Sequence, residues 1–203
     1  MKEIRMGRIY CLMGKSASGK DTVYRALLTE TDLSLREVVL YTTRPIRSGE
    51  TDGITYHFCT EEDARALSDA GKVIEMRTYQ TVHGPWSYFT VDDGQIDLDT
   101  SDYLLIGTLE SFEKIRSYFG AERVAGIYIY TDDGLRLSRA LERERKQAEP
   151  KYAELCRRFL ADEKDFSEEK LEAAGIDIRI ENQELADTVK EAAFFIQNGK
   201  VRG

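Results

Sequence analysis

The sequence is poor in the residues that build metal centres and disulfide frameworks. It has only two histidines, and its three cysteines, Cys11, Cys59 and Cys156, lie far apart and form no CxxC pair. Neither a zinc cluster nor a disulfide scaffold is therefore indicated. The pattern of cysteine use suits a reducing compartment, so we expect a cytoplasmic protein.

Long apolar runs and an excess of positive charge are also absent. No stretch approaches the roughly 18 apolar residues of a membrane span, and the run 9–13 is too short for the core of a signal peptide. The 29 basic residues are outnumbered by 37 acidic ones, which gives a net charge of −8. Such a chain is a poor candidate for binding nucleic acid or an anionic membrane. A local basic pocket for a small phosphate ligand is still compatible with it.

What is present is an alternation of strand-like and helical segments. Buried strands are expected at 7–13, 103–106, 125–130 and 176–180, and helices at 20–28, 109–119 and 184–197. This order predicts an α/β fold in which helices flank a mainly parallel sheet.

Two other stretches differ from that alternation. Residues 41–91 are strand-rich, with β-rich segments at 38–43, 56–59, 73–77 and 86–91 and one helix from Thr60 to Gly71. Thr60 and Asp63 have the spacing of a capping box. From 135 to about 174 the chain is helical and highly charged, with a break near Pro150.

A glycine-rich segment follows the first expected strand and fits the pattern GxxxxGK. Glycines let successive backbone N–H groups face one anion, and the helix that begins at Gly19 adds the positive end of its dipole. Lys20 would reach the β- and γ-phosphates of a nucleotide. The expected nucleotide-binding residues are Gly14, Lys15, Ser16, Ala17, Ser18, Gly19, Lys20, Asp21 and Thr22.

Asp21 stands where this motif has the Ser or Thr that holds Mg²⁺, and Thr22 comes one position later. A carboxylate beside a triphosphate is repulsive unless a cation lies between them. One hypothesis is that Asp21, with Thr22 beside it, helps to hold Mg²⁺ directly or through water. The alternative is that Asp21 points away from the phosphates and stabilises the helix start through the dipole.

Residues 42–58 carry a second anion-binding pattern. Arg44 and Arg47 can form a fork for a phosphate dianion, and Tyr56 can add a hydroxyl donor. This acceptor segment closely resembles the nucleotide-acceptor segment of guanylate kinases, whose pattern is TTRxPRxGExxGxDYxF. The matching residues are Thr42, Thr43, Arg44, Arg47, Gly49, Glu50, Gly53, Tyr56 and Phe58, with the proline one place early.

The resemblance covers nearly the whole chain and is weakest between 80 and 120. It implies a P-loop nucleoside-monophosphate kinase that transfers the γ-phosphoryl group of ATP to GMP or dGMP with Mg²⁺. It also implies that Glu75 reads the N1 and N2 hydrogens of guanine. The chain would be a single domain, 1–203, with an acceptor-binding region at 41–91, a lid at about 135–165 and a core at 1–40, 103–134 and 170–203.

Several positions depart from the family pattern. A serine that contacts guanine in the family is Leu40 here. The family's Tyr-Gly-Ser is matched only by 83–85, which makes His83 a candidate acceptor contact. Ile106 and Thr108 replace an aspartate pair after the fourth strand, and Thr108 is expected near the acceptor.

Arginines follow in the expected lid. Arg136, Arg139 and Arg143 are spaced to share one helix face, an arrangement that usually marks a solvated, ion-paired surface. The family pattern RLxxR…RL resembles the segments around Arg139, Arg143 and Arg158, which implies that these arginines close over the transferring phosphoryl group. With Lys20 and Arg44 they are the expected catalytic residues.

Asn182 falls where the family has an asparagine near the base and ribose of ATP. A turn asparagine is the alternative interpretation of this residue.

Two other functions stay open. The chain also resembles ribose 1,5-bisphosphate phosphokinases, which have Gly-Lys-Asp in the loop and lack the aspartate after the fourth strand, although segment 49–56 and Glu75 favour a purine acceptor. A non-catalytic domain that binds phosphopeptides is disfavoured by the intact Gly14, Gly19 and Lys20. The sequence indicates neither the oligomeric state nor the physiological phosphoryl donor.

Overall fold

The computed structural model describes residues 6–29, 31–81 and 84–199. Its elements, in chain order, are β1 (Ile9–Met13), α1 (Lys20–Thr29), β2 (Arg36–Glu37), β3 (Tyr41–Thr42), β4 (His57–Phe58), α2 (Glu61–Asp69), β5 (Val73–Thr81), β6 (Gly84–Val91), β7 (Tyr103–Ile106), α3 (Leu109–Phe119), β8 (Val124–Tyr130), α4 (Asp133–Arg145), α5 (Tyr152–Asp165), α6 (Glu168–Ala174), β9 (Ile178–Glu181) and α7 (Leu185–Asn198).

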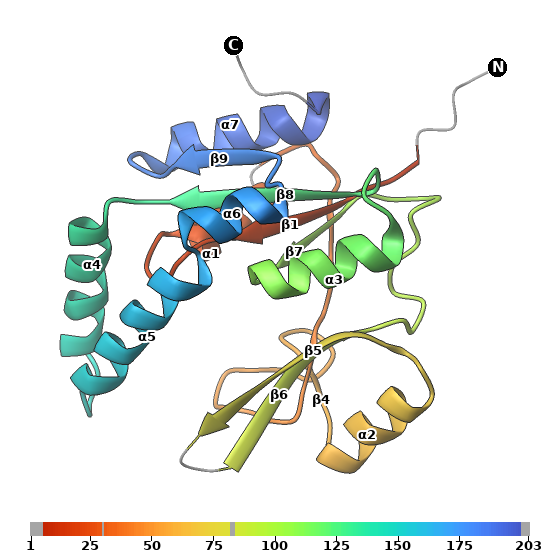
Figure 1. Cartoon of the computed structure of the whole chain (residues 1–203), viewed down its shortest axis with the longest axis horizontal. Helices are drawn as coiled ribbons and strands as arrows, with labels where there is room; N and C mark the ends of the chain where they lie inside the picture. The colour runs from red at the N-terminus through yellow and green to blue at the C-terminus, as the bar shows by residue number, and fades with distance from the viewer. Residues whose placement is uncertain (1–5, 30, 82–83, 200–203) are drawn as a thin grey trace.

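The main sheet is parallel, with strand order β2-β7-β1-β8-β9. Successive side chains of a strand point to opposite faces, so the fully apolar β1 supplies both layers of the core. Tyr10 and Leu12 pack with residues of α1 and α7, whereas Cys11 and Met13 pack with residues of α3 and α6. Figure 1 shows the helices on both sides of this sheet. The predicted α/β class is confirmed.

A second, mixed sheet with the order β4-β3-β6-β5 is built entirely from residues 41–91. Its largest part is the antiparallel β5–β6 hairpin. Helix α2 packs Ala64 against Phe89 on one face, and the expected capping box between Thr60 and Asp63 is confirmed. The hairpin and α2 lie away from the main sheet (Figure 1), and Arg77, Tyr79 and Tyr88 of the hairpin line a cavity.

The β-rich segment expected at 38–43 forms a strand only at Tyr41–Thr42, which is β3 of the second sheet. The preceding strand β2, in the main sheet, ends at Glu37. Between them the N–H of Val38 still donates to the carbonyl of Leu104, and the N–H of Val39 donates to Oε1 of Gln95. The segment therefore connects two sheets rather than extending one strand.

The charged helical stretch is interrupted twice. One break, between α4 and α5, includes Pro150 as expected, and a second occurs at Phe166 and Ser167, where Ser167 caps α6. Helices α4 and α5 lie beside the end of the sheet to which the arrows of β8 and β9 point (Figure 1). Parallel sheets bind ligands at this carboxyl end. Within the described residues, no helix is long and apolar enough to cross a membrane.

Candidate active site

The predicted phosphate loop, residues 14–20, has no room for side chains at its two glycines. A Cβ at Gly14 would lie 2.4 Å from the backbone oxygen of Ile129, and a Cβ at Gly19 would lie 2.2 Å from Nδ2 of Asn182. The carbonyl of Gly19 accepts the backbone N–H groups of Thr22 and Val23, so the loop runs directly into α1. A loop of this shape at a helix start presents N–H groups to an anion.

Buried polar side chains of two other segments donate hydrogen bonds to the carbonyl of Ser18 in the loop. Nδ2 of Asn182 donates to the carbonyl of Ser18 over 2.8 Å, and Oγ1 of Thr131 donates to the same oxygen over 3.1 Å. Oδ1 of Asn182 accepts from Thr188. Asn182 is only 6% exposed, so in this structure its amide anchors the loop. The expected contact of Asn182 with ATP stays a prediction.

Two carboxylates of α5 contact the first half of the loop, at Lys15 and Ser16. The backbone N–H of Ser16 donates to Oδ2 of Asp162 over 2.7 Å, and Nζ of Lys15 lies 2.8 Å from both carboxylate oxygens of Glu163. An acidic side chain of the chain itself therefore occupies one of the N–H groups that the motif would offer to a phosphate.

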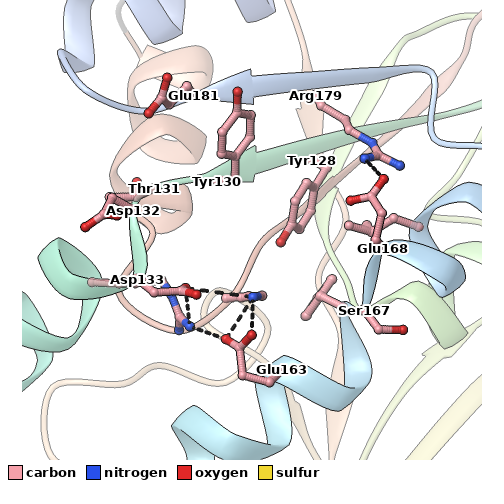
Figure 2. A pocket seen from close by; sticks show the side chains of 14 residues that line it. Tyr128, Tyr130, Thr131, Asp132, Asp133, Glu163, Ser167, Glu168, Arg179 and Glu181 are labelled. Carbon is pink, nitrogen blue, oxygen red and sulfur yellow. Dashed lines mark hydrogen bonds and ion pairs between the residues drawn. The ribbon is translucent and has the colours of Figure 1, made fainter.

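Arg136 of α4 completes this network. Its side chain is 1% exposed, and Nη1 donates to the carbonyl of Ser16 over 3.1 Å. Nη2 pairs with Asp133 and Glu163, and the guanidinium carbon lies 4.3 Å from the ring centroid of Phe159. Figure 2 shows Asp133 and Glu163 in this network, at the edge of a cavity of about 640 Å³. Arg136 is thus the arginine of the α4 face that reaches the loop.

Lys20 and Asp21 begin α1 and face a second cavity, of about 350 Å³. Nζ of Lys20 lies 3.3 Å from Oδ2 of Asp21. Thr22 is exposed at the next position. The cavity is lined by Gly14, Ser16, Lys20, Asp21, Leu40, Tyr56, Arg77, Tyr79, Tyr88, Ile106, Gly107, Thr108, Asp162 and Phe166.

In the acceptor segment, Arg44 and Glu50 form a bidentate pair. Nη1 and Nη2 of Arg44 donate to the two carboxylate oxygens over 2.7 and 2.5 Å. These hydrogen bonds raise the pKa of Arg44 and lower the pKa of Glu50 to about 2. The backbone N–H of Arg47 binds the same carboxylate, while the residue is exposed and its guanidinium lies 5.8 Å from the Trp86 ring. The two arginines are therefore not equivalent.

Tyr56 links this pair to the cavity. The guanidinium carbon of Arg44 lies 5.1 Å from the centroid of the Tyr56 ring, and burial raises the pKa of the Tyr56 hydroxyl. Tyr56 also lines the 350 Å³ cavity together with Lys20. The phosphate loop and the acceptor segment thus both line the 350 Å³ cavity.

Glu75 is buried near the 350 Å³ cavity but is not part of its lining. Its side chain is 1% exposed and does not line the cavity. Arg77 Nε donates to its Oε2 over 3.0 Å, and Thr90 Oγ1 donates to its Oε1 over 2.9 Å. In this structure the carboxylate is bound by the chain's own donors.

The chain is similar to known proteins over nearly its whole length. A family model described as guanylate kinase matches residues 6–199. The chain belongs to the guanylate kinase family. A guanylate kinase of Cupriavidus metallidurans is 27% identical over 97% of this chain and 85% of its own length. One from Granulibacter bethesdensis is 32% identical over 62% and 57%, and one from Cupriavidus pinatubonensis is 40% identical over 38% and 34%.

The alignments with the last two proteins thus span less than two thirds of those relatives. Among solved structures, a guanylate kinase from Anaplasma phagocytophilum matches with a TM-score of 0.69 and 21% identity, over 98% of this chain and 88% of that one. At this identity the likeness shows the fold.

Within the guanylate kinase family pattern, the structure does not bring all expected residues together. Thr108 lines the cavity but also caps α3, where its hydroxyl accepts the N–H of Ser111. Arg139, Arg143 and Arg158 have no hydrogen bond or ion pair with the loop among the described residues; Nε of Arg158 lies 3.8 Å from Glu154. His83 lies outside the described residues.

Four residues near the site received no role from the sequence: Arg77, Arg136, Asp162 and Glu163. Helical spacing places Arg136 on the face of Arg139 and Arg143, but this spacing does not tell which of the three is buried. Asp162 and Glu163 belong to a charged helix in which many acidic residues look alike.

Proposed function

We propose that the chain transfers the γ-phosphoryl group of ATP to GMP or dGMP and releases ADP and GDP or dGDP. The observation that carries this proposal is the single cavity lined by Lys20 and by Tyr56. Phosphoryl transfer needs donor and acceptor phosphates in line and little covalent chemistry from the protein. Most of the rate gain then comes from positioning and charge neutralisation.

The proposed roles follow the position of each residue. The N–H groups of the phosphate loop and Lys20 hold the donor phosphates, and Asn182 lies behind them. Arg44, Arg47 and Tyr56 hold the acceptor phosphate in the region 41–91. The lid, about 135–165, carries Arg139, Arg143 and Arg158, which act after it closes over the nucleotides.

Mg²⁺ fits the donor side of the cavity. Asp21 lines it and its side chain is 60% exposed, and Mg²⁺ is commonly held by one or two carboxylates, substrate phosphates and waters. Asp21, with Thr22 next to it, would hold the ion directly or through water. The bound ion would neutralise charge on the ATP phosphates.

A coupled ADP-release assay tests the proposal. ATP and Mg²⁺ are supplied with GMP, dGMP, AMP, CMP, UMP or ribose 1,5-bisphosphate in turn, and turnover with GMP or dGMP is expected. Lys20→Ala should abolish it. Lys190→Ala is the matched control, because Nζ of Lys190 also lies 3.3 Å from an aspartate, Asp187, but its side chain is 67% exposed and does not line the cavity.

The other outcomes are distinct. Turnover with ribose 1,5-bisphosphate alone would replace the acceptor and keep the kinase chemistry. Failure to bind ATP would favour the non-catalytic phosphopeptide-binding domain.

A further inference from the structure

The 640 Å³ cavity shown in Figure 2 lies against the edge of the main sheet. One side is formed by Tyr128 and Tyr130 of β8. The other residues on this side are Arg179 and Glu181 of the edge strand β9, which are opposite the two tyrosines in the parallel register. The starts of α4 and α6 and the end of α5 complete the lining. A volume of this size is usual for a small-molecule pocket, about 300–1,000 Å³.

This cavity is separate from the one proposed for the nucleotides. Among the described residues, the two cavities share only Phe166. Of the phosphate loop, Lys15 lines the 640 Å³ cavity, whereas Ser16 and Lys20 line the 350 Å³ cavity. The proposed phosphoryl transfer therefore gives the 640 Å³ cavity no ligand.

A buried tyrosine hydroxyl points into this cavity. Tyr128 is 4% exposed, and its ring packs against those of Tyr130 and Phe166, with centroids 6.4 and 5.5 Å away. Figure 2 shows its hydroxyl directed toward the group that contains Asp133 and Glu163, yet the hydroxyl makes no hydrogen bond with any described residue. Burial raises the pKa of Tyr128 to about 12, so the hydroxyl is neutral and can donate to a ligand or accept from one.

The charged groups around the cavity leave an excess of negative charge. Three basic and five acidic side chains line it, namely Lys15, Arg136, Arg179, Asp132, Asp133, Glu163, Glu168 and Glu181. The basic groups are all paired within the chain, by contacts with Asp133, Glu163 and Glu168. Asp132 and Glu181 form no ion pair among the described residues. The net charge of the lining is therefore −2.

These two unpaired carboxylates lie at one end of the cavity. Glu181 is opposite Tyr130 in the register of β8 and β9, and Asp132 follows Tyr130 two residues later. Figure 2 shows both carboxylates on the side of the cavity next to Tyr130, whereas the Tyr128 hydroxyl points toward Glu163. A ligand thus meets negative charge at one end, aromatic rings along its length and a neutral hydroxyl further in.

We propose that the 640 Å³ cavity is a second ligand site, which binds a small organic ammonium compound that also carries a hydroxyl group. The ammonium group pairs with Asp132 and Glu181, and the carbon chain lies against the Tyr130 ring. The hydroxyl group of the compound bonds to that of Tyr128. A cation gains from carboxylates and from a tyrosine ring.

The same features exclude two other classes of ligand. An anion is repelled by the negative excess, because the basic groups are already paired within the chain. A metal ion is disfavoured because, within the described residues, no group of histidine, cysteine, aspartate and glutamate side chains is arranged to hold one. The inference does not depend on the phosphotransferase activity.

The test is an NMR titration of the full chain, without nucleotide, with aminobutanol, aminopentanol and aminohexanol. Saturable binding is expected, with shifts of amide signals from β8, β9 and the starts of α4 and α6. The alkylamine of the same length lacks the hydroxyl group and should bind about 2- to 10-fold more weakly. The diol of the same length lacks the charge and should also bind more weakly than the amino alcohol.

Tyr128→Phe distinguishes ligand binding from a structural role. Because its hydroxyl has no partner in the folded chain, the substitution should leave urea unfolding unchanged. It should weaken binding of the amino alcohol about 2- to 10-fold and leave binding of the alkylamine unchanged. Tyr152→Phe, at an exposed position outside the cavity, is the matched control.

Removal of the two carboxylates tests the ammonium contact. Asp132→Asn/Glu181→Gln should weaken binding of both the amino alcohol and the alkylamine about 2- to 25-fold, since each substitution removes one exposed charge pair. Asparagine caps a helix as well as aspartate does, so α4 should persist. Glu172→Gln, exposed on α6 and outside the cavity, is the matched control.

Four outcomes would overturn the inference. The first is the absence of saturable binding. The second is binding that is unchanged in both cavity variants, which would reflect only diffuse attraction to a chain of net charge −8. The third is dependence on the carboxylates without dependence on Tyr128, and the fourth is binding that is lost in Lys20→Ala, which would place the compounds in the nucleotide cavity. Loss in both cavity variants, with Lys20→Ala binding like the parent, would sustain it.

Discussion

Nδ2 of Asn182 donates a 2.8 Å hydrogen bond to the carbonyl of Ser18 and so joins the end of β9 to the phosphate loop. The same amide nitrogen fills the space in which a Cβ of residue 19 would stand. The conformation of the loop thus depends on a side chain 164 residues further along the chain.

Asn182→Ala should destabilise the fold and weaken ATP binding together. The substitution leaves the buried carbonyl of Ser18 with only the 3.1 Å bond from Thr131, and a lost partner for a buried polar group costs about 1–3 kcal/mol. Urea unfolding and ATP titration measure the two effects. Gln183→Ala, at the exposed neighbouring position, is the control. An Asn182→Ala chain as stable as the parent would contradict the anchoring role.

Arg136→Met should lower the free energy of unfolding by about 2 kcal/mol, the value of hydrogen bonds to charged groups. The loss is moderated because the side chains of Asp133 and Glu163 are 53% and 38% exposed and water can solvate them. Arg145→Ala, at the exposed end of α4, should change stability by less than about 0.5 kcal/mol. Equal effects of the two substitutions would show that the buried network does not stabilise the fold.

Asp162→Asn should lower the KM for ATP by about threefold to tenfold. Asp162 accepts the N–H of Ser16, and its negative charge opposes a phosphate at the same loop. Asparagine keeps an acceptor oxygen without the charge, so the fold should persist. Asp165→Asn is the matched control on the same helix, since Asp165 is 66% exposed. A raised KM in Asp162→Asn would mean that the carboxylate assists ATP binding.

The Arg44–Glu50 pair should stabilise the fold at neutral pH and lose this effect only below about pH 4.5. The pKa of Glu50 falls from 4.5 to about 2 in the folded chain. Its stabilising contribution is therefore complete above about pH 4.5 and is lost as the pH falls towards 2. Chemical unfolding of the parent and of Glu50→Gln should show a difference that is constant from pH 7 to 5 and shrinks below pH 4.5. A difference that stays constant down to pH 3 would exclude this linkage.

Local signals were sufficient for much of the fold. The run 103–106 and the helix 109–119 have the predicted bounds, and the capping box at Thr60 forms as its spacing predicted. Segment 38–43 shows where local signals stop. Its β-rich residues predict strand, but only Tyr41 and Thr42 form one, because these two residues pair with β6, which lies far away in the chain.

The candidate site also has a part that the sequence predicted and a part that only the tertiary structure decided. The phosphate loop and the acceptor segment are visible in the order of residues, because their glycine positions and arginine spacing are local requirements of anion binding. The sequence could not show that Arg77 stands between Glu75 and the cavity, or that Arg136 rather than Arg139 reaches Ser16. Those contacts arise when elements as far apart as the loop and α4 pack together, and packing decides which of several similar charged side chains becomes buried.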